Sequence, residues 1–127
     1  MASPFILAGV SEDEMIKPAV EGTKALLEAC LEFGIKKCII TSSMVTVMGA
    51  DNIKNSYGEE DFVPGNGKYL SPYGKSKVLA EQCCREFMKT VPPDSPLEII
   101  TIHPGFITGK PESLTKRSDS LPENERL

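Results

Sequence analysis

Two short apolar runs, each preceded by a long segment of helical periodicity, constrain the fold of this 127-residue chain most. The first run, at 37–42, contains Cys38-Ile39-Ile40 without polar alternation, which is typical of a strand covered on both faces. The second run lies at 97–102. Helices that alternate with covered strands predict a parallel sheet within an α/β layer.

The first helix is predicted from Ser11 to Phe33. Ser11 and Glu14 have the spacing of a capping box, and Gly34 is placed to end the helix. Pro18 removes an amide within this stretch, so a kink or a late start is expected. Its apolar positions repeat at helical period and predict the buried face, namely Ile16, Val20, Leu27 and Leu31, with Leu26 and Cys30 beside them.

The second helix is predicted to open at Ser71 and Pro72, as N-cap and first turn, and to run to about Thr90. Its inward face is predicted to hold Leu79, Ala80, Cys83, Cys84, Phe87 and Met88. The connection from 49 to 70 has no predicted element, and loops of this length are usually functional or disordered.

Composition excludes several classes of partner. Lys plus Arg number 14 and Asp plus Glu number 18, a net charge of −4 that argues against nucleic acid or an anionic membrane surface. The sequence contains no apolar run long enough to span a membrane and no basic secretory n-region. The four cysteines lack C-x-x-C spacing and His103 is the single histidine, so we expect no metal site, a structural role for His103, buried reduced thiols and a cytoplasmic location.

Three polar features converge at one end of the predicted sheet. Ser42 and Ser43 follow the first strand, Tyr73 and Lys77 lie in the first turns of the second helix, and Pro104-Gly105 follows the second strand. Ligands of open α/β sheets bind outside the carboxyl ends of the strands. The sequence therefore predicts a site at this edge.

The residue types suit a proton-transfer site. Tyr73 and Lys77 are four residues apart and share a helix face. A phenol is a poor acid at neutral pH, and a nearby ammonium makes it a stronger one. With Ser43 holding the same substrate oxygen, the set suits interconversion of an alcohol and a carbonyl, provided that a nicotinamide cofactor carries the hydride. Each feature alone also fits a structural role, such as an amphipathic pair or a plain turn; their order on the right elements favours the site.

The chain resembles the extended short-chain dehydrogenase/reductases, in particular the branch of dihydroflavonol reductase and cinnamoyl-CoA reductase. The resemblance covers about residues 2–109. It is carried by Ala2-Ser3-Pro4-Phe5, the segment from Glu14 to Thr23, Ile39-Ile40-Thr41-Ser42-Ser43, Tyr73-Gly74-Lys75-Ser76-Lys77 with Leu79-Ala80-Glu81, and Thr101-Ile102-His103-Pro104-Gly105. It implies a partial Rossmann-like, doubly wound parallel sheet.

The resemblance also implies roles for individual residues. Tyr73 is the catalytic acid and base, and Lys77 makes its hydroxyl more acidic and hydrogen-bonds the nicotinamide ribose. Ser43 orients the substrate carbonyl, with Ser42 as the alternative. The residues that would line the nicotinamide end of the cofactor site are Pro104, Gly105, Phe106 and Ile107. The cofactor is NADP or NAD, with NADP favoured by the branch, and the Ala2-Ser3-Pro4 segment would pass near it.

The chain departs from the family where a Gly-rich turn binds the pyrophosphate. It has no such turn, so residues 1–109 are expected to be the central part of an NAD(P)-binding domain whose N-terminal half is missing, in a truncated copy. Residues 110–127 are expected to be a polar, mobile tail. A two-stranded sheet with an uncovered edge predicts weak stability and self-association.

Two other functions stay open at this point. One is a catalytically inactive remnant or interaction module of the same fold. The other is a nucleotide-sugar epimerase or dehydratase that shares the Ser, Tyr and Lys. Ala19 stands where sugar-modifying relatives more often carry Asn, which favours the reductase branch. The predicted partner is then a small carbonyl or alcohol substrate.

Overall fold

The computed structural model describes residues 11–49, 54–64 and 71–109. The predicted order of helix, strand, helix and strand is confirmed. The elements are α1 (Glu12–Glu32), β1 (Lys37–Thr41), α2 (Val45–Met48), the 3-10 turn η1 (Glu59–Asp61), α3 (Pro72–Thr90) and β2 (Glu98–Ile102). The predictions for Ala2 to Phe5 and for the tail at 110–127 concern residues outside these ranges.

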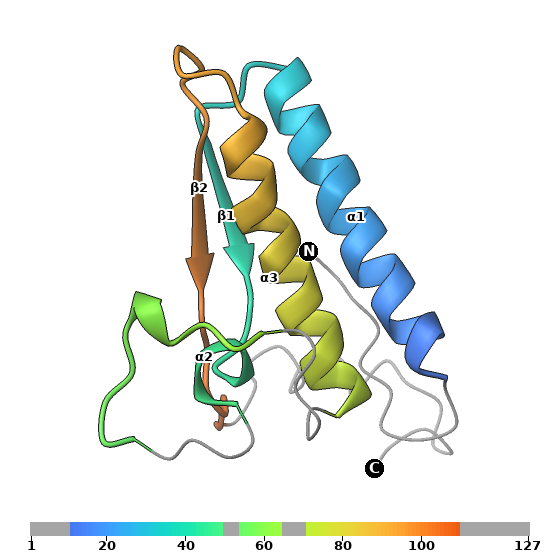
Figure 1. Ribbon diagram of the computed structural model, residues 1–127, viewed down its shortest axis with the longest axis vertical. Coiled ribbons are helices and arrows are strands. Elements are labelled where there is room, and N and C mark those ends of the chain that lie inside the picture. The colour runs from blue at the N-terminus through green and yellow to red at the C-terminus, as the bar shows by residue number, and fades with distance from the viewer. Residues whose placement is uncertain (1–10, 50–53, 65–70, 110–127) are drawn as a thin grey trace, which may run out of the picture.

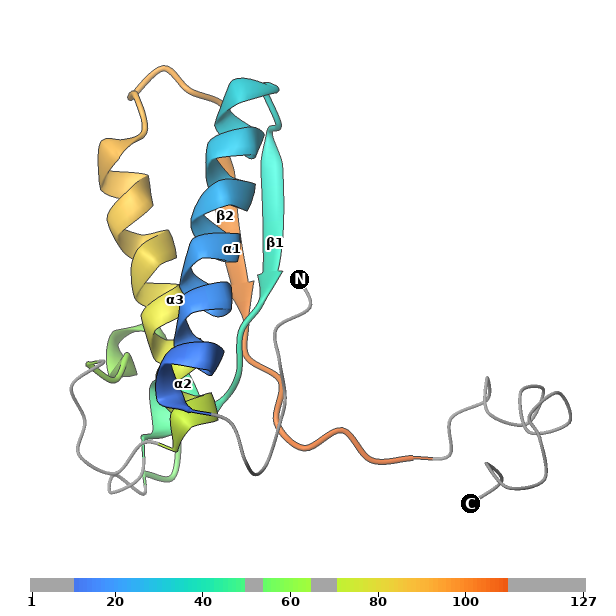
Figure 2. The same cartoon turned by 90° about the vertical axis from the view of Figure 1, so that its right-hand side faces the viewer.

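The sheet is parallel, as predicted, and α3 connects its two strands. The register pairs Lys37 with Glu98 at one end and Thr41 with Ile102 at the other. Helices α1 and α3 lie side by side over the same face of the sheet (Figures 1 and 2). The carboxyl ends of both strands and the N-terminus of α3 therefore meet at one edge, where the site is predicted.

The limits of α1 follow from its capping residues. The Ser11 hydroxyl accepts a hydrogen bond from the Glu14 amide at 3.3 Å, and the Ser11 amide donates to the Glu14 carboxylate at 2.9 Å. Gly34 ends the helix with φ +64°. Of the kink or late start expected at Pro18, the late start is wrong, because the helix begins at Glu12 and continues through Pro18. Pro18 has no amide to donate to the Glu14 carbonyl. Glu14 is exposed, so water can hydrogen-bond to that carbonyl instead.

The buried face of α1 differs from the predicted one. The buried residues are Met15, Ala19, Thr23, Leu27 and Cys30, so Leu27 and Cys30 are buried as predicted. Ile16 and Val20 are only partly buried, and Leu26 and Leu31 are 37% and 36% exposed. The prediction followed the largest apolar side chains. The small Ala19 and Thr23 occupy the buried face instead, where α1 packs against α3.

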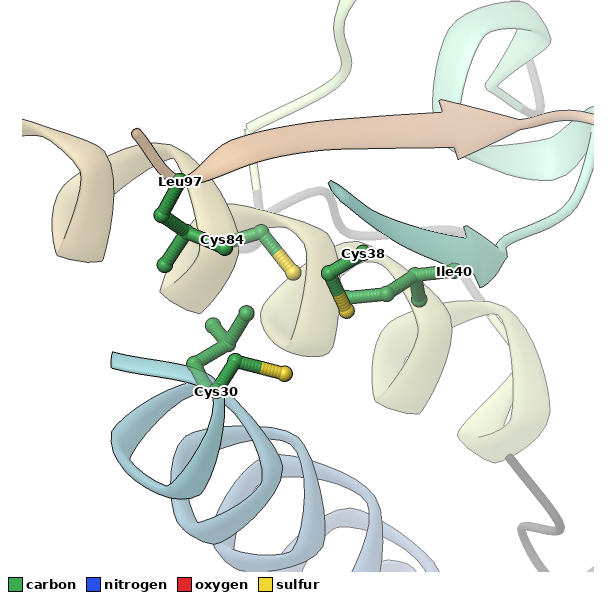
Figure 3. Close-up of a cluster of buried hydrophobic side chains, with 6 residues drawn as sticks. Cys30, Cys38, Ile40, Cys84 and Leu97 are labelled. Atoms are coloured by element: carbon green, nitrogen blue, oxygen red, sulfur yellow. The ribbon is translucent and has the colours of Figure 1, made fainter. Parts of the chain in front are cut away.

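A cluster of apolar side chains joins both helices to the sheet (Figure 3). Cys84 of α3 is buried and Phe87 packs against the cluster, as predicted. Leu79, Ala80 and Cys83 are only partly buried and Met88 is exposed, so that part of the predicted inward face is wrong. The cluster consists of Leu27, Cys30, Cys38, Ile40, Cys84 and Leu97.

The cysteines are free thiols. Cys30, Cys38 and Cys84 are buried as predicted, whereas Cys83 is only partly so. Burial raises the pKa of Cys84 to about 12 and also raises that of Cys38.

The opposite face of the sheet is bare within the described residues. Ile39 is 61% exposed, so the prediction that β1 is covered on both faces is wrong for this part of the chain. The reason is geometric: α1 and α3 both pack on the face that carries Cys38 and Ile40.

The connection between β1 and α3 carries two short helical turns that the sequence analysis did not predict. Helix α2 begins just after Ser43, and η1 lies in the described segment 54–64. The Val63 amide donates to the Thr46 carbonyl at 2.8 Å, so this segment is tied to α2.

Candidate active site

The edge at which both strands end is held by backbone hydrogen bonds that continue beyond the sheet. The Ser42 amide donates to the Ile102 carbonyl at 2.8 Å, and the Met44 amide donates to the Pro104 carbonyl at 3.1 Å. The segments after the two strands therefore run together, which places Ser43 beside Pro104.

An open hollow of about 570 Å³ lies at this edge. Its walls include Ser43, Tyr73 and the whole segment from Pro104 to Ile107. The structure thus brings together most of the residues that the sequence analysis selected. The volume lies within the range of about 300–1,000 Å³ that small-molecule sites occupy.

Tyr73 is placed by the start of α3. The Ser71 hydroxyl caps the helix by accepting a hydrogen bond from the Gly74 amide at 3.1 Å, and Pro72 occupies the first turn. This cap fixes the direction in which the helix starts, and Tyr73 is half-buried against the hollow.

Lys77 lies behind Tyr73, one helical turn on. Its Nζ atom is 5.7 Å from the centroid of the Tyr73 ring. It lines a separate, small cavity of about 20 Å³ together with Ser42 and Glu81. Burial lowers the pKa of Lys77. The predicted Tyr–Lys proximity is therefore present, with the lysine next to the hollow and not in its wall.

The two serines have different surroundings. Ser42 donates from Oγ to the Glu81 carboxylate at 2.6 Å, within the protein. Ser43 lines the hollow, and its Oγ accepts a long hydrogen bond of 3.5 Å from the Val45 amide. Of the two serines, Ser43 is the one placed to reach a molecule in the hollow.

The segment after β2 forms the apolar side of the hollow. A Cβ atom at Gly105 would approach the Met44 Sδ to 3.3 Å, so glycine lets this segment lie close to the end of β1. Phe106 is 95% exposed. The apolar walls and the adjacent Tyr73 fit the nicotinamide end of a dinucleotide cofactor.

Sequence reasoning missed the role of Glu81. Its carboxylate is buried on α3 and accepts hydrogen bonds from Ser42, Thr46 and His103 at 2.6, 2.7 and 2.8 Å, all on Oε2. Arg85 donates to the other oxygen at 2.9 Å. Burial raises the pKa of Glu81, but the hydrogen bonds from these four side chains outweigh it and leave the pKa below its ordinary value.

A signal for this carboxylate was present in the sequence. Gly74, Val78, Glu81 and Cys84 recur at helical spacing, and all four are buried. An acidic residue within a buried stripe needs hydrogen-bond donors. His103, predicted to be structural, is one of these donors.

Within residues 11–49, 54–64 and 71–109, no three His, Cys, Asp or Glu side chains are grouped so that they could hold a metal ion. The same ranges contain no helix that is both long and apolar enough to cross a membrane.

Comparison with known proteins decides the family. The model of the 3-beta hydroxysteroid dehydrogenase/isomerase family matches residues 1–118. The chain belongs to this family. It is also 35% identical over 122 residues to a ketoreductase of Aspergillus fumigatus, covering 83% of this chain and 36% of that protein. It is 30% identical over 122 residues to dihydroflavonol 4-reductase of Arabidopsis thaliana, covering 90% of this chain and 32% of that protein. The predicted dihydroflavonol reductase-like resemblance is thereby confirmed.

Solved structures of reductases share the fold. Yeast methylglyoxal/isovaleraldehyde reductase Gre2, solved with NADPH, superposes with a TM-score of 0.67 at 25% identity, over 85% of this chain and 35% of that chain. The predicted Rossmann-like class is confirmed by this match. The chain spans about two-fifths or less of the length of the curated relatives it matches.

Proposed function

We propose that the protein is an NAD(P)-dependent oxidoreductase, with NADP favoured, that interconverts an alcohol and a ketone or aldehyde. The observation that carries this proposal is that Ser43, Tyr73 and Pro104 to Ile107 line the same hollow, with Lys77 next to the tyrosine. Similarity to a ketoreductase and to a reductase solved with NADPH supports the same reaction class.

In the direction of reduction, a nicotinamide held beside Pro104 to Ile107 would supply the hydride that the carbonyl carbon accepts. The Tyr73 hydroxyl passes its proton to the carbonyl oxygen, which becomes the alcohol. Ser43 donates a hydrogen bond to that oxygen as negative charge develops on it. The Lys77 ammonium stabilises the phenolate left on Tyr73. Lys77 would also hold the nicotinamide ribose, and Pro104 to Ile107 would line the nicotinamide.

A binding and turnover measurement tests this proposal. The protein, expressed at the length of its native transcript, is expected to quench or shift NADPH fluorescence on binding and to oxidise NADPH when an aldehyde or ketone is added. NADPH binding without turnover on any carbonyl would favour the catalytically inactive alternative. Turnover confined to a nucleotide sugar would favour the epimerase or dehydratase alternative, and absence of NADPH binding would overturn the proposal.

We further propose that residues 1–109 form the central part of the cofactor-binding domain. The protein is proposed to act in the cytoplasm, which its free thiols support. Limited proteolysis, which cleaves mobile segments first, and imaging of a tagged protein check these two statements.

The bare sheet face supports self-association of this chain. Ile39 and Ile102 are exposed side chains of neighbouring strands, and uncovered apolar strands favour association. Sedimentation velocity at several concentrations checks this, and a concentration-independent monomer would contradict it.

A further inference from the structure

Glu81 is a buried carboxylate that joins three separate parts of the fold. Its side chain is only 1% exposed. Its Oε2 atom accepts from Ser42 at the end of β1, from Thr46 of α2 and from His103 after β2. A carboxylate can accept several hydrogen bonds at once, so this one residue of α3 ties the helix to every segment that reaches the hollow.

Each donor is a close neighbour of a residue in the proposed site. Ser42 precedes Ser43, and His103 precedes Pro104. Thr46 also contacts Ser43 directly, because its amide and its hydroxyl lie 3.1 and 2.9 Å from the Ser43 carbonyl oxygen. Tyr73 and Lys77 stand on the same helix as Glu81 itself. The carboxylate therefore fixes Ser43 and Pro104 relative to Tyr73.

Arg85 extends the connection toward the segment 54–64. Its guanidinium pairs with the second oxygen of Glu81 at 2.9 Å and lies 4.5 Å from the centroid of the Phe62 ring. The next residue, Val63, bonds to the Thr46 carbonyl. The Arg85 guanidinium thus balances the charge of Glu81. The segment 54–64 is anchored through Phe62 and Val63.

We propose that Glu81 is a positioning residue for the reaction and that it acts through Ser42, Thr46 and His103. This role rests on the proposed function. It does not line the hollow itself but a small cavity behind it. Displacement of reacting groups by about 1 Å can lower a rate about 100-fold. Loss of this carboxylate is therefore expected to act on kcat and to leave cofactor affinity nearly unchanged.

Two variants and one matched control test the inference. Glu81→Gln keeps the volume but retains only one acceptor oxygen. Thr46→Val removes a single donor and serves if Glu81→Gln does not fold. Thr90→Val is the control, because the Thr90 hydroxyl bonds to the Phe87 carbonyl at the C-terminal end of α3 and Thr90 lines neither the hollow nor the small cavity beside Glu81.

Hydrogen exchange supplies a readout that needs no activity. In Glu81→Gln and Thr46→Val the amides of Met44 and Thr46 are expected to exchange about tenfold faster, the effect of roughly one lost hydrogen bond. In Thr90→Val they are expected to keep the wild-type rate. Unchanged exchange in the first two variants would overturn the inference, whether or not the protein turns over.

Kinetics supply the second readout. In the native-length protein, Glu81→Gln is expected to lower kcat about 10- to 100-fold with the NADPH dissociation constant changed less than about threefold. Glu81→Asp is expected to recover part of the loss. Wild-type kcat in Glu81→Gln would overturn the positioning role, whereas a wild-type protein that neither binds NADPH nor turns over would instead overturn the proposed function.

Discussion

Replacement of Leu27 by alanine tests the packing that holds α1 and α3 against the sheet. Leu27 is 0% exposed and belongs to the cluster between α1, the sheet and α3. The change removes the equivalent of about three methylene groups, worth about 2.4 kcal/mol in lost burial. A cavity that does not collapse raises the cost toward about 5 kcal/mol. We therefore expect a loss of about 3–5 kcal/mol in the free energy of unfolding.

The preceding residue provides a matched control. Leu26 is chemically identical but 37% exposed, so its replacement by alanine is expected to cost at most about 1.5 kcal/mol. Urea unfolding of both variants of the 127-residue chain, followed by circular dichroism, measures the two costs. Equal losses, or a larger loss for Leu26→Ala, would refute the assignment of the buried face of α1.

Three further predictions follow from the charges and thiols around the site. Lys77→Met is expected to lower kcat for carbonyl-dependent NADPH oxidation about 100-fold. Lys75→Met, which removes the ion pair to Glu12, is expected to change that kcat less than about twofold. Equal effects of the two variants would contradict the role of Lys77. Cys84, whose pKa burial raises to about 12, is expected to resist iodoacetamide at pH 8 until the protein unfolds; rapid labelling of the folded chain, seen by mass spectrometry, would contradict this. The lowered pKa of Glu81 means that its charged form stabilises the fold above the ordinary glutamate pKa of about 4.3, a contribution lost as pH falls through the lower folded value. The urea midpoint of unfolding is therefore expected to fall more between pH 6 and pH 3 for wild type than for Glu81→Gln. An equal fall in both proteins would contradict this contribution of Glu81.

Local signals in the sequence predicted the ends of the helices well. The capping box at Ser11, the glycine at position 34 and the Ser71-Pro72 start each act through their own hydrogen bonds or backbone angles, so no distant residue is needed to interpret them. The hollow at the carboxyl edge of the parallel sheet, where the candidate site lies, was predictable for a similar reason, since its position follows from the order of elements.

Features that depend on tertiary contacts were not predictable in this way. The short helix α2 contains two β-branched valines, and it is held by contacts of Thr46 with Ser43, Glu81 and Val63. The buried face of α1 depends on how closely α3 approaches, which favours small side chains over the leucines that dominate the periodicity.

The proton-transfer role of Tyr73 is the central claim, and a comparison of two tyrosine variants tests it most directly. Tyr73→Phe removes the hydroxyl at the hollow, while Tyr57→Phe removes one that accepts from the Lys54 amide at 2.8 Å in the segment 54–64. Carbonyl reduction is followed as loss of NADPH absorbance in the native-length protein. We predict that Tyr73→Phe lowers kcat by about 100- to 10,000-fold with NADPH affinity within about threefold of wild type, and that Tyr57→Phe retains most of the activity. Undiminished turnover in Tyr73→Phe would contradict the account.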